Sequence, residues 1–268
     1  MRIQVTSTQT QYSVLVCICV SILAYSANAA AQSVKSHPWL AEAPGEFVRL
    51  IDRGNVSIVV DDERIRKAGK SALTLFQFVI DYDFKYRHQL LGFDNENQAW
   101  QARIVAWMDL PKIKLEHKIC IQSSFTPAMP WESKLLRHEF DHVAISTDPR
   151  FLKIIKRSLQ QRRQWIEKWE QASEPTEKDV RERIQTAIKS QAQLLEKLVQ
   201  SQYDLLDAES SQGLSIIGGR KEFFCGLYTV EGLERCKFEM DKATQSFVNS
   251  LESASRREVD AHYLFLKP

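Results

Sequence analysis

The sequence predicts an α+β protein in which an antiparallel sheet is followed by a helix with the motif HExxH and then by a long antiparallel helical hairpin. Three observations predict this class. Apolar residues alternate with polar ones over Phe76–Tyr86, as in a half-buried strand. After Pro127 and Pro130 the apolar residues recur with the period of a helix. A stretch of helical composition, rich in Arg, Lys and Gln, then begins at Phe151.

The first 29 residues have the features of a secretory signal peptide. Arg2 precedes an apolar run from Val14 to Tyr25, and this run ends at the small-residue pattern Ala27-Asn28-Ala29. The run is too short to cross a bilayer, and no later segment reaches the ~20 apolar residues that a transmembrane helix needs. We therefore expect cleavage near Ala29 and a secreted or periplasmic mature chain without a transmembrane segment. An uncleaved anchor is the alternative.

The mature chain, residues 30–268, is long enough for one large domain, and we expect a single domain with a C-terminal helical part. The formal net charge is +2 and basic residues alternate with acidic ones, so nothing indicates nucleic-acid binding. In an oxidising compartment Cys225 and Cys236 are the expected disulfide pair. Cys120 lies on a predicted strand and is expected to be a buried, small apolar residue.

The sheet is expected to begin with a strand and a helix and to continue as an antiparallel meander. The β-branched run Val56–Val60 predicts the first strand, and Asp61 and Asp62 are candidate caps for a helix that extends toward Leu73. Three alternating runs follow: Phe76–Tyr86, a run from Ala102 that Pro111 interrupts, and Ile113–Gln122.

The helix with the HExxH motif is expected to end near Thr147, because Asp148 can cap a new helix that has Pro149 at its first position. Thr176-x-x-Asp179 resembles a capping box at the start of a long return helix. The remaining helices are expected over Phe151–Ala172, from Thr176 to about Glu209, and over Asp241–Val259, with a glycine-marked loop at Gly213, Gly218 and Gly219.

The candidate site is the run His138-Glu139-Phe140-Asp141-His142. Residues four apart lie on one face of a helix, so His138 and His142 can bind one Zn²⁺ while Glu139 acts as the general base on a metal-activated water. A His pair on an ordinary surface helix is the alternative. The two imidazoles share one polar stripe of an otherwise apolar helix, which favours the zinc site.

A catalytic zinc site has three protein ligands and one open position, and three acids are candidates for the third ligand. Asp148 follows His142 at the metzincin spacing, but the chain lacks the glycine that this turn needs, and Asp148 is also a helix cap. Each residue of a helix adds the same rise along the axis. In an antiparallel hairpin the return helix would therefore bring Asp207 and Glu209 to about the height of His142. Tyr203 could donate to a tetrahedral oxyanion, although a Tyr on an amphipathic helix is more often a core residue.

The order of strand, helix, strands and HExxH helix is that of the zincin fold. In that fold an edge strand beside the metal helix pairs with an extended peptide, and Ile113–Gln122 would be this edge strand.

The segment Met129–Ser146 resembles a family of secreted bacterial zinc peptidases that is catalogued as domain of unknown function 922. A second motif of that family, Tyr-Asp-x-x-Thr-x-His-Gly, is similar to the residues from Tyr203 to Ser210. Tyr203 and Asp204 match, whereas Asp207 stands at the Thr, Glu209 at the His and Ser210 at the Gly. The resemblance covers Val56–Gly213 in element order. It implies a zincin-like protease of unknown substrate, with Glu209 as the third zinc ligand.

We expect a secreted zinc-dependent metallopeptidase that hydrolyses the bonds of a peptide or protein substrate with a metal-activated water. The alternative is a non-catalytic exported binding or scaffold protein with a structural or vestigial metal site. The letters HEFDH also occur in peptide deformylases, but the glycine-rich strand and the Glu-Gly-Cys-Leu stretch of those enzymes are missing here. We therefore reject a deformylase.

Overall fold

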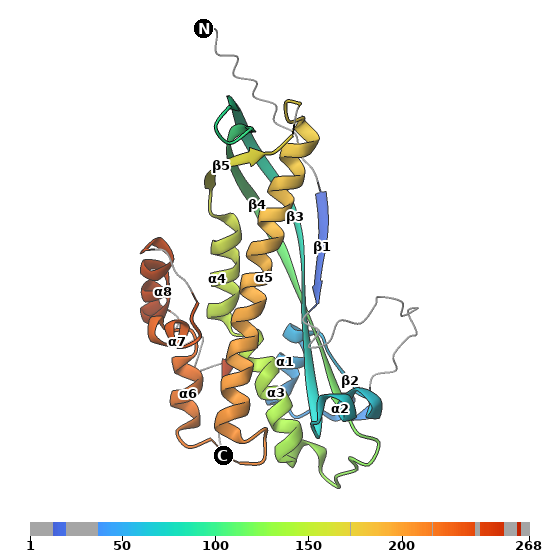
Figure 1. Cartoon of the computed structure of the whole chain (residues 1–268). Coiled ribbons are helices and arrows are strands. Elements are labelled where there is room, and N and C mark those ends of the chain that lie inside the picture. Colours follow the sequence, from blue (N-terminus) through green and yellow to red (C-terminus); the bar gives the residue numbers. More distant parts are fainter. Residues whose placement is uncertain are drawn as a thin grey trace. The chain divides into compact units, whose positions relative to one another are not determined.

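The computed structural model confirms the α+β class: several helices accompany a sheet that is mostly antiparallel and has five strands among the described residues (Figure 1). It describes residues 13–19, 37–171, 173–215, 217–238, 242–254 and 262–263. The elements in chain order are β1 (Ser13–Cys19), η1 (Pro38–Glu42), α1 (Gly45–Gly54), β2 (Val56–Val60), α2 (Asp62–Ala68), β3 (Ala72–Asp94), β4 (Ala99–Ile121), η2 (Pro130–Glu132), α3 (Lys134–Ser146), α4 (Pro149–Gln160), β5 (Arg163–Trp169), α5 (Glu177–Ser210), α6 (Arg220–Gly226), α7 (Val230–Arg235) and α8 (Lys242–Ala254).

The strand order is β1-β3-β4-β2, and β5 also pairs with β4. β2 runs parallel to the end of β4, with Val56 opposite His117, whereas β5 is antiparallel to the start of β4, with Trp100 opposite Trp169. Because β4 lies between β3 and β2, the predicted edge strand Ile113–Gln122 is wrong: this stretch is internal to the sheet.

Pro111 does not interrupt β4, although the alternating pattern predicted two strands there. It lies between the stretch that pairs with β5, Trp100–Ala106, and the stretch that pairs with β2, His117–Ile121. Proline lacks the N–H that a neighbouring strand would need, and it is tolerated where one side of a strand has no partner. Two of the predicted strands therefore form one long strand.

The first strand and helix of the prediction are observed. β2 has the predicted bounds, and the side chain of Asp61 caps α2 by accepting a hydrogen bond of 3.1 Å from the backbone N–H of Arg64. The helix ends sooner than expected, at Ala68, because Gly69 adopts a left-handed conformation with φ 65° that stops it.

The predicted helical hairpin is not observed as such, because the outbound helix α4 ends at Gln160 and β5 follows it. In β5 the exposed side chains alternate with more buried ones, among them Trp165 and Trp169, which is the period of a strand. The return helix α5 is confirmed. At its start the Thr176 Oγ1 accepts a hydrogen bond from the Asp179 N–H, and the Thr176 N–H donates to the Asp179 carboxylate, as a capping box requires.

Contacts divide the chain into two compact units, which we describe separately. The first unit contains Val79–Ile113 and Ile155–Leu195. Within it the start of α5 packs on the sheet, where the Tyr86 hydroxyl donates a hydrogen bond of 2.9 Å to Glu177.

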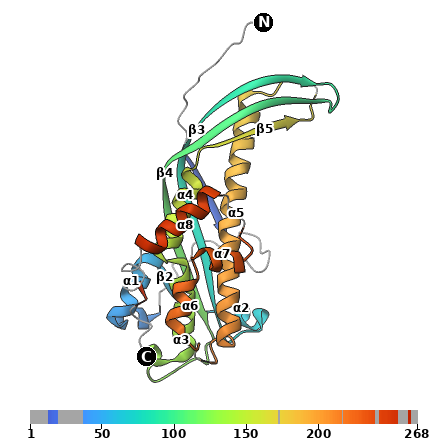
Figure 2. The same cartoon turned by 90° about the vertical axis from the view of Figure 1, so that its left-hand side faces the viewer.

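The second unit contains described parts of Ile18–Phe78, Lys114–Ile154 and Glu196–Pro268, and it holds all the candidate site residues. Figure 2 shows α3 and the later part of α5, both within this unit, in a second view. The apolar face of α3 packs on α1, where the Phe140 and Phe47 ring centroids are 5.1 Å apart. The polar face of α3 is thereby left for the candidate site.

The described residues near the two ends of the chain test few of the predictions made for those regions. β1 falls within the predicted signal peptide, and the cleavage pattern Ala27–Ala29 lies outside the described residues, so the signal peptide stays a prediction. Helix α8 agrees with the described part of the helix expected over Asp241–Val259. In the part of the chain that the structure describes, none of the helices combines the length and the apolar character needed to cross a membrane.

Candidate metal centre

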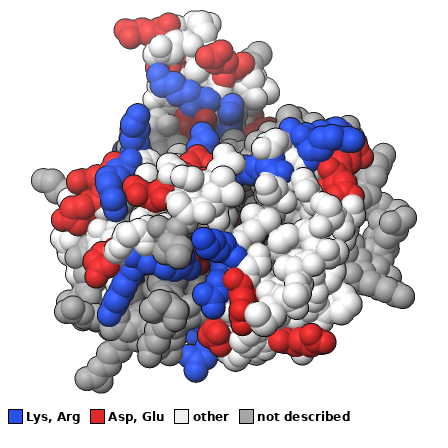
Figure 3. Space-filling model, turned by 90° about the horizontal axis from the view of Figure 1, so that it is seen from below, with Lys and Arg blue, Asp and Glu red and all other residues white. Residues whose placement is uncertain are grey.

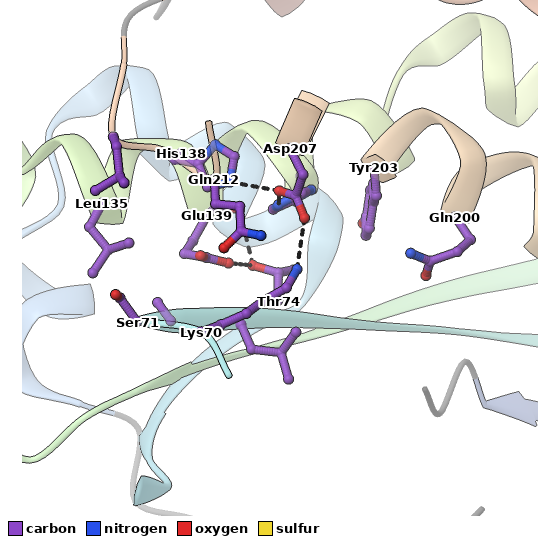
Figure 4. Close-up of a pocket in the computed structure, with 14 residues that line it drawn as sticks. Lys70, Ser71, Thr74, Leu135, His138, Glu139, Gln200, Tyr203, Asp207 and Gln212 are labelled. Carbon is purple, nitrogen blue, oxygen red and sulfur yellow. Dashed lines mark hydrogen bonds and ion pairs between the residues drawn. The ribbon is translucent and has the colours of Figure 1, made fainter. Parts of the chain in front are cut away.

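Helix α3 brings the two histidines of the motif together, as predicted. Ser133 caps the helix by accepting from the backbone N–H of Leu136. His138 and His142 are buried, with ring centroids 4.7 Å apart. Both line a pocket that is drawn in Figure 4. This geometry agrees with the i, i+4 spacing from which the site was predicted.

Asp207 of α5 meets both imidazoles. Its Oδ1 lies 2.9 Å from the His138 Nε2 and 3.1 Å from the His142 Nε2. Ligand atoms of these three residues lie within 4.8 Å of one another, close enough for the three side chains to hold a metal ion together. The His138–Asp207 contact is drawn in Figure 4.

The structure groups Asp207, and not the expected third ligand Glu209, with the two histidines. Glu209 is exposed, and it lies two residues beyond Asp207, which is a turn of about 200° around the helix axis. When Asp207 faces α3, Glu209 must face away from it. Asp207, which stands at the Thr of the similar family motif, therefore lies where Glu209, which stands at the His, was expected.

Asp148, the other candidate ligand, is fully buried and engaged elsewhere. Its Oδ1 accepts a hydrogen bond of 2.7 Å from the Arg150 N–H, which caps α4 as predicted. Its Oδ2 accepts from the Arg150 guanidinium at 2.8 Å and from the Tyr263 hydroxyl at 2.6 Å. These contacts exclude Asp148 from the metal site.

A lysine supports Asp207 from the other carboxylate oxygen. Lys70, in the turn before β3, donates a hydrogen bond of 2.7 Å to the Asp207 Oδ2. Burial opposes ionisation of Asp207, but hydrogen bonds from His138, His142 and Lys70 outweigh it and hold the pKa of this carboxyl well below its usual value. Asp207 is therefore an ionised acceptor at neutral pH.

Glu139, the predicted general base, lines the same pocket and is oriented by β3. The Thr74 hydroxyl donates a hydrogen bond of 2.7 Å to the Glu139 Oε2 (Figure 4). Among the described residues no hydrogen bond to the Glu139 Oε1 is present, so this oxygen remains available to accept a proton.

Tyr203 lies behind the histidines and is a core residue. Its ring centroid is 4.5 Å from that of His142, and its hydroxyl donates a hydrogen bond of 3.0 Å to the Ser146 Oγ. Burial raises the pKa of the Tyr203 hydroxyl further above its usual value. Because the hydroxyl is engaged by α3, the contact favours the core role over the predicted oxyanion role.

Ser146, which accepts the hydrogen bond from Tyr203, also contacts His117 on β4. The His117 Nδ1 must donate to the Gly54 carbonyl, 2.6 Å away, so its Nε2 is an acceptor for the Ser146 hydroxyl at 2.5 Å. The resulting chain of hydrogen bonds, from Tyr203 through Ser146 to His117, joins α5, α3 and β4 behind the candidate metal ligands.

Three residues that support the site were missed in the sequence. Thr74 and Phe76 are two residues apart in β3, so their side chains point to the same face of the sheet. The alternating pattern could therefore have placed Thr74 on the buried face. Ser210, whose Oγ lies 3.3 Å from the His138 Nδ1, is three residues after Asp207 and so on the same face of α5. Lys70 lies in a turn, and no local pattern indicates its contact with α5.

The charges around the site are paired locally. The side chain of Asp141, between the two histidines, is buried and forms an ion pair with Arg220 of α6. Burial raises the pKa of Asp141 to about 6, although Arg220 opposes this shift. On the face drawn in Figure 3, basic side chains are interspersed with acidic ones, in agreement with the formal net charge of +2.

The cysteine predictions have different outcomes. Cys120 is fully buried on β4, as predicted, and packs with Val59 and Ile65. No disulfide joins Cys225 of α6 and Cys236, which follows α7, in the structure. Their pairing in the exported protein stays a prediction.

Comparisons with known proteins add no relative. No family model matches the chain, and neither the curated proteins nor the solved structures contain a match. The resemblance to domain of unknown function 922 therefore rests only on the residues quoted for it.

Proposed function

We propose that His138, His142 and Asp207 bind a zinc ion and that the chain is a zinc-dependent peptidase. One observation carries the proposal: three ligand atoms converge within 4.8 Å, and a buried glutamate beside the first histidine lines the same pocket. Two imidazoles and one carboxylate form a ligand set that zinc accepts in catalytic sites, where a fourth position stays open.

The three converging ligand atoms suit a metal cation. The Asp207 Oδ1 is an acceptor that lies close to both Nε2 atoms, so either a proton or a cation must lie between each nitrogen and the oxygen. The Nδ1 of His142 is buried and has no hydrogen-bond partner among the described residues, which leaves its Nε2 as the nitrogen that can be engaged. A zinc ion would satisfy the three converging atoms together.

When bound, zinc would acidify a water molecule and polarise a substrate carbonyl. The Glu139 Oε1 would take the proton from that water as it attacks the carbonyl carbon, and would then deliver the proton to the leaving amine nitrogen. Thr74 contributes by holding the Glu139 Oε2, which fixes the carboxylate while the other oxygen exchanges the proton.

The pocket also indicates where a substrate would lie. Its wall includes the residues Lys70, Ser71, Ala72, Leu73 and Thr74, at the start of β3. The second neighbour of β3 in the sheet is β1, which falls within the predicted signal peptide and would be removed with it. We therefore propose the start of β3, in place of the end of β4, as the strand on which an extended peptide would align in the mature chain.

The experiment is a zinc analysis of the purified mature protein together with a peptide-library hydrolysis assay. We expect one zinc per chain and a hydrolytic activity that a chelator abolishes and added zinc restores. Glu139→Gln should retain zinc and lose between about 10²- and 10⁴-fold in turnover, because an amide cannot accept the proton. Glu132→Gln, on the exposed turn before α3, is the matched control and should remain active.

Two results would contradict this proposal in different ways. Stoichiometric zinc without hydrolysis of any library member would favour the binding or scaffold alternative. Protein that binds no zinc at micromolar concentration would show that the histidines and Asp207 are not a zinc site.

A further inference from the structure

Leu214 lies in the turn that follows α5, and its side chain is 76% exposed. Single exposed leucines are ordinary on protein surfaces, so exposure alone gives this residue no role. Its place in the fold is what distinguishes it, because Leu214 lines the same pocket as His138 and Glu139. An aliphatic side chain at this place is available to contact a substrate.

The turn that carries Leu214 is fixed beside His138. Ser211, Gln212 and Gly213 have φ of 49°, 58° and 82°, and two of them are not glycine, so the surrounding structure must enforce this backbone. A Cβ at Gly213 would lie 2.8 Å from the His138 Cγ, which shows how closely the turn packs on the imidazole. The Leu214 N–H then donates a hydrogen bond of 3.3 Å to the Ser211 carbonyl. Leu214 therefore has a defined position relative to a candidate metal ligand.

Leu135 of α3 is a second apolar residue of the pocket. It lies three residues before His138 and four before Glu139, so the three side chains share one face of the helix. In Figure 4 Leu135 lies toward one end of the pocket and Gln200 toward the opposite end, with His138 and Glu139 between them. The two ends of the pocket therefore differ in polarity.

The direction of the chain brings Leu214 to the end where Leu135 lies. Figure 4 shows that Gln200, Asp207 and Gln212 follow one another across the pocket toward Leu135. Leu214 comes two residues after Gln212. The two leucines, one from α3 and one from the turn after α5, thus make this end of the pocket apolar.

The charged groups of the pocket offer little to a charged substrate side chain. Lys70, whose ammonium could attract an acidic side chain, forms an ion pair of 2.7 Å with Asp207. One oxygen of Glu139 accepts from Thr74, and the other is the proposed acceptor of the proton from water. A charged side chain placed between the leucines would lose its hydration without gaining a partner.

We propose that Leu135 and Leu214 form an apolar subsite beside Glu139, which takes a large aliphatic or aromatic side chain of the substrate residue next to the scissile bond. The inference rests on the proposed peptidase function and deepens it by naming the substrate class. Leu214 is then a specificity-determining residue, because it contacts the substrate but neither the metal nor the attacking water.

The test starts with the cleavage sites of the wild type in a peptide library, identified by mass spectrometry. One position next to the scissile bond should be occupied by large apolar residues. Three peptides that differ only there, with leucine, alanine or aspartate, are then compared by kcat/KM. The wild type should favour the leucine peptide over the aspartate peptide by roughly 100-fold, since the aspartate would be desolvated without a partner.

Two substitutions of Leu214 separate recognition from support of the turn. Leu214→Ser should lower kcat/KM for the leucine peptide by about 10-fold and change that for the alanine peptide little. Leu214→Arg should raise kcat/KM for the aspartate peptide above the wild-type value, which a residue that only stabilises the turn would not do. Both variants should retain one zinc per chain.

Leu194→Ser is the matched control. Leu194 of α5 is also an exposed leucine, but it is not among the residues that line the pocket. Its preference among the three peptides should equal that of the wild type. A library without an apolar preference next to the cleaved bond would overturn the inference. Equal losses for all three peptides in Leu214→Ser, or the same loss in Leu194→Ser, would also overturn it.

Failure of the proposed function gives a different result. A wild type that binds no zinc or cleaves no library member would overturn that function. Calorimetric binding of the leucine and aspartate peptides to Glu139→Gln ranks the same pair without turnover. Tighter binding of the leucine peptide, lost when Leu214→Ser is added, would support the subsite, and equal binding of the two peptides would overturn it.

Discussion

Two carboxylates near the end of α5, Asp207 and Glu209, differ in what they can do for a metal. Asp207 is half-buried and held by Lys70 and two histidines, whereas Glu209 is exposed. Asp207→Ala should therefore abolish stoichiometric zinc, because two remaining protein ligands cannot hold it tightly. Glu209→Ala is the control at a neighbouring position and should bind zinc like the wild type. Metal analysis after dialysis measures both.

The opposite outcome would be equally informative. If Glu209→Ala lost zinc and Asp207→Ala retained it, the similarity to the family motif would have identified the ligand correctly. The end of α5 would then have to be rotated by about 200° from the observed orientation.

At the scale of elements, the contact between α5 and α3 decides which residues face the site. Tyr203 is one turn before Asp207, and its hydroxyl is the first donor of the chain that passes through Ser146 to His117. This contact fixes the rotation of α5 against α3 and thereby the direction of Asp207.

Tyr203→Phe tests this role against the oxyanion role. The ring would still pack on His142, and the loss of one buried hydrogen bond should cost about 1 kcal/mol of unfolding free energy. Zinc affinity and turnover should remain within a few-fold of the wild type. Urea unfolding, zinc titration and the hydrolysis assay measure these quantities. A fall in turnover of about 10²- to 10³-fold with zinc retained would restore the oxyanion role.

The sequence predicted those elements whose pattern is local. The alternating Phe76–Tyr86 run, the caps at Asp61 and Asp148 and the capping box at Thr176 each depend on neighbours in the chain, and all are observed. The merging of two runs into β4 depends on which strands pair with it, and that is not a local property.

The distinction between local and non-local patterns also explains which residues of the candidate site could be predicted from the sequence. The HExxH spacing lies within one helix, so the histidine pair could be predicted. The proposed third ligand, Asp207, comes from a helix about 65 residues away, and equal helix rise gives its height along the axis but not the direction in which its side chain points. That is why Asp207 and Glu209 could not be separated until the packing of Tyr203 was known. Lys70 and Thr74 likewise become neighbours of the site only through the fold.

At the scale of the whole molecule, the buried histidine behind the site makes stability depend on pH. Burial lowers the pKa of His117 to about 4, and His142 adds to this effect although the Gly54 carbonyl opposes it. An unfolded chain would bind a proton at His117 near its ordinary pKa of about 6.5. Between these values the unfolded state binds more protons, so the contribution to stability is complete above about pH 6.5 and is lost as the pH falls toward 4. Asp141 acts in the opposite direction, because its pKa is raised to about 6 and its contribution is lost as the pH rises through that value.

His117→Gln isolates the contribution of the histidine. A glutamine can donate to the Gly54 carbonyl and accept from Ser146 without titrating, while Asp141 is the same in both proteins. The pKa difference at His117 corresponds to roughly 3 kcal/mol, so the wild type should lose about this much more unfolding free energy than the variant between about pH 7 and pH 4. Urea unfolding of the metal-free proteins measures the difference without a contribution from zinc. Parallel pH profiles would mean that His117 is hydrated or protonated in the folded protein, and the hydrogen-bond chain that orients α5 would then have to be drawn differently.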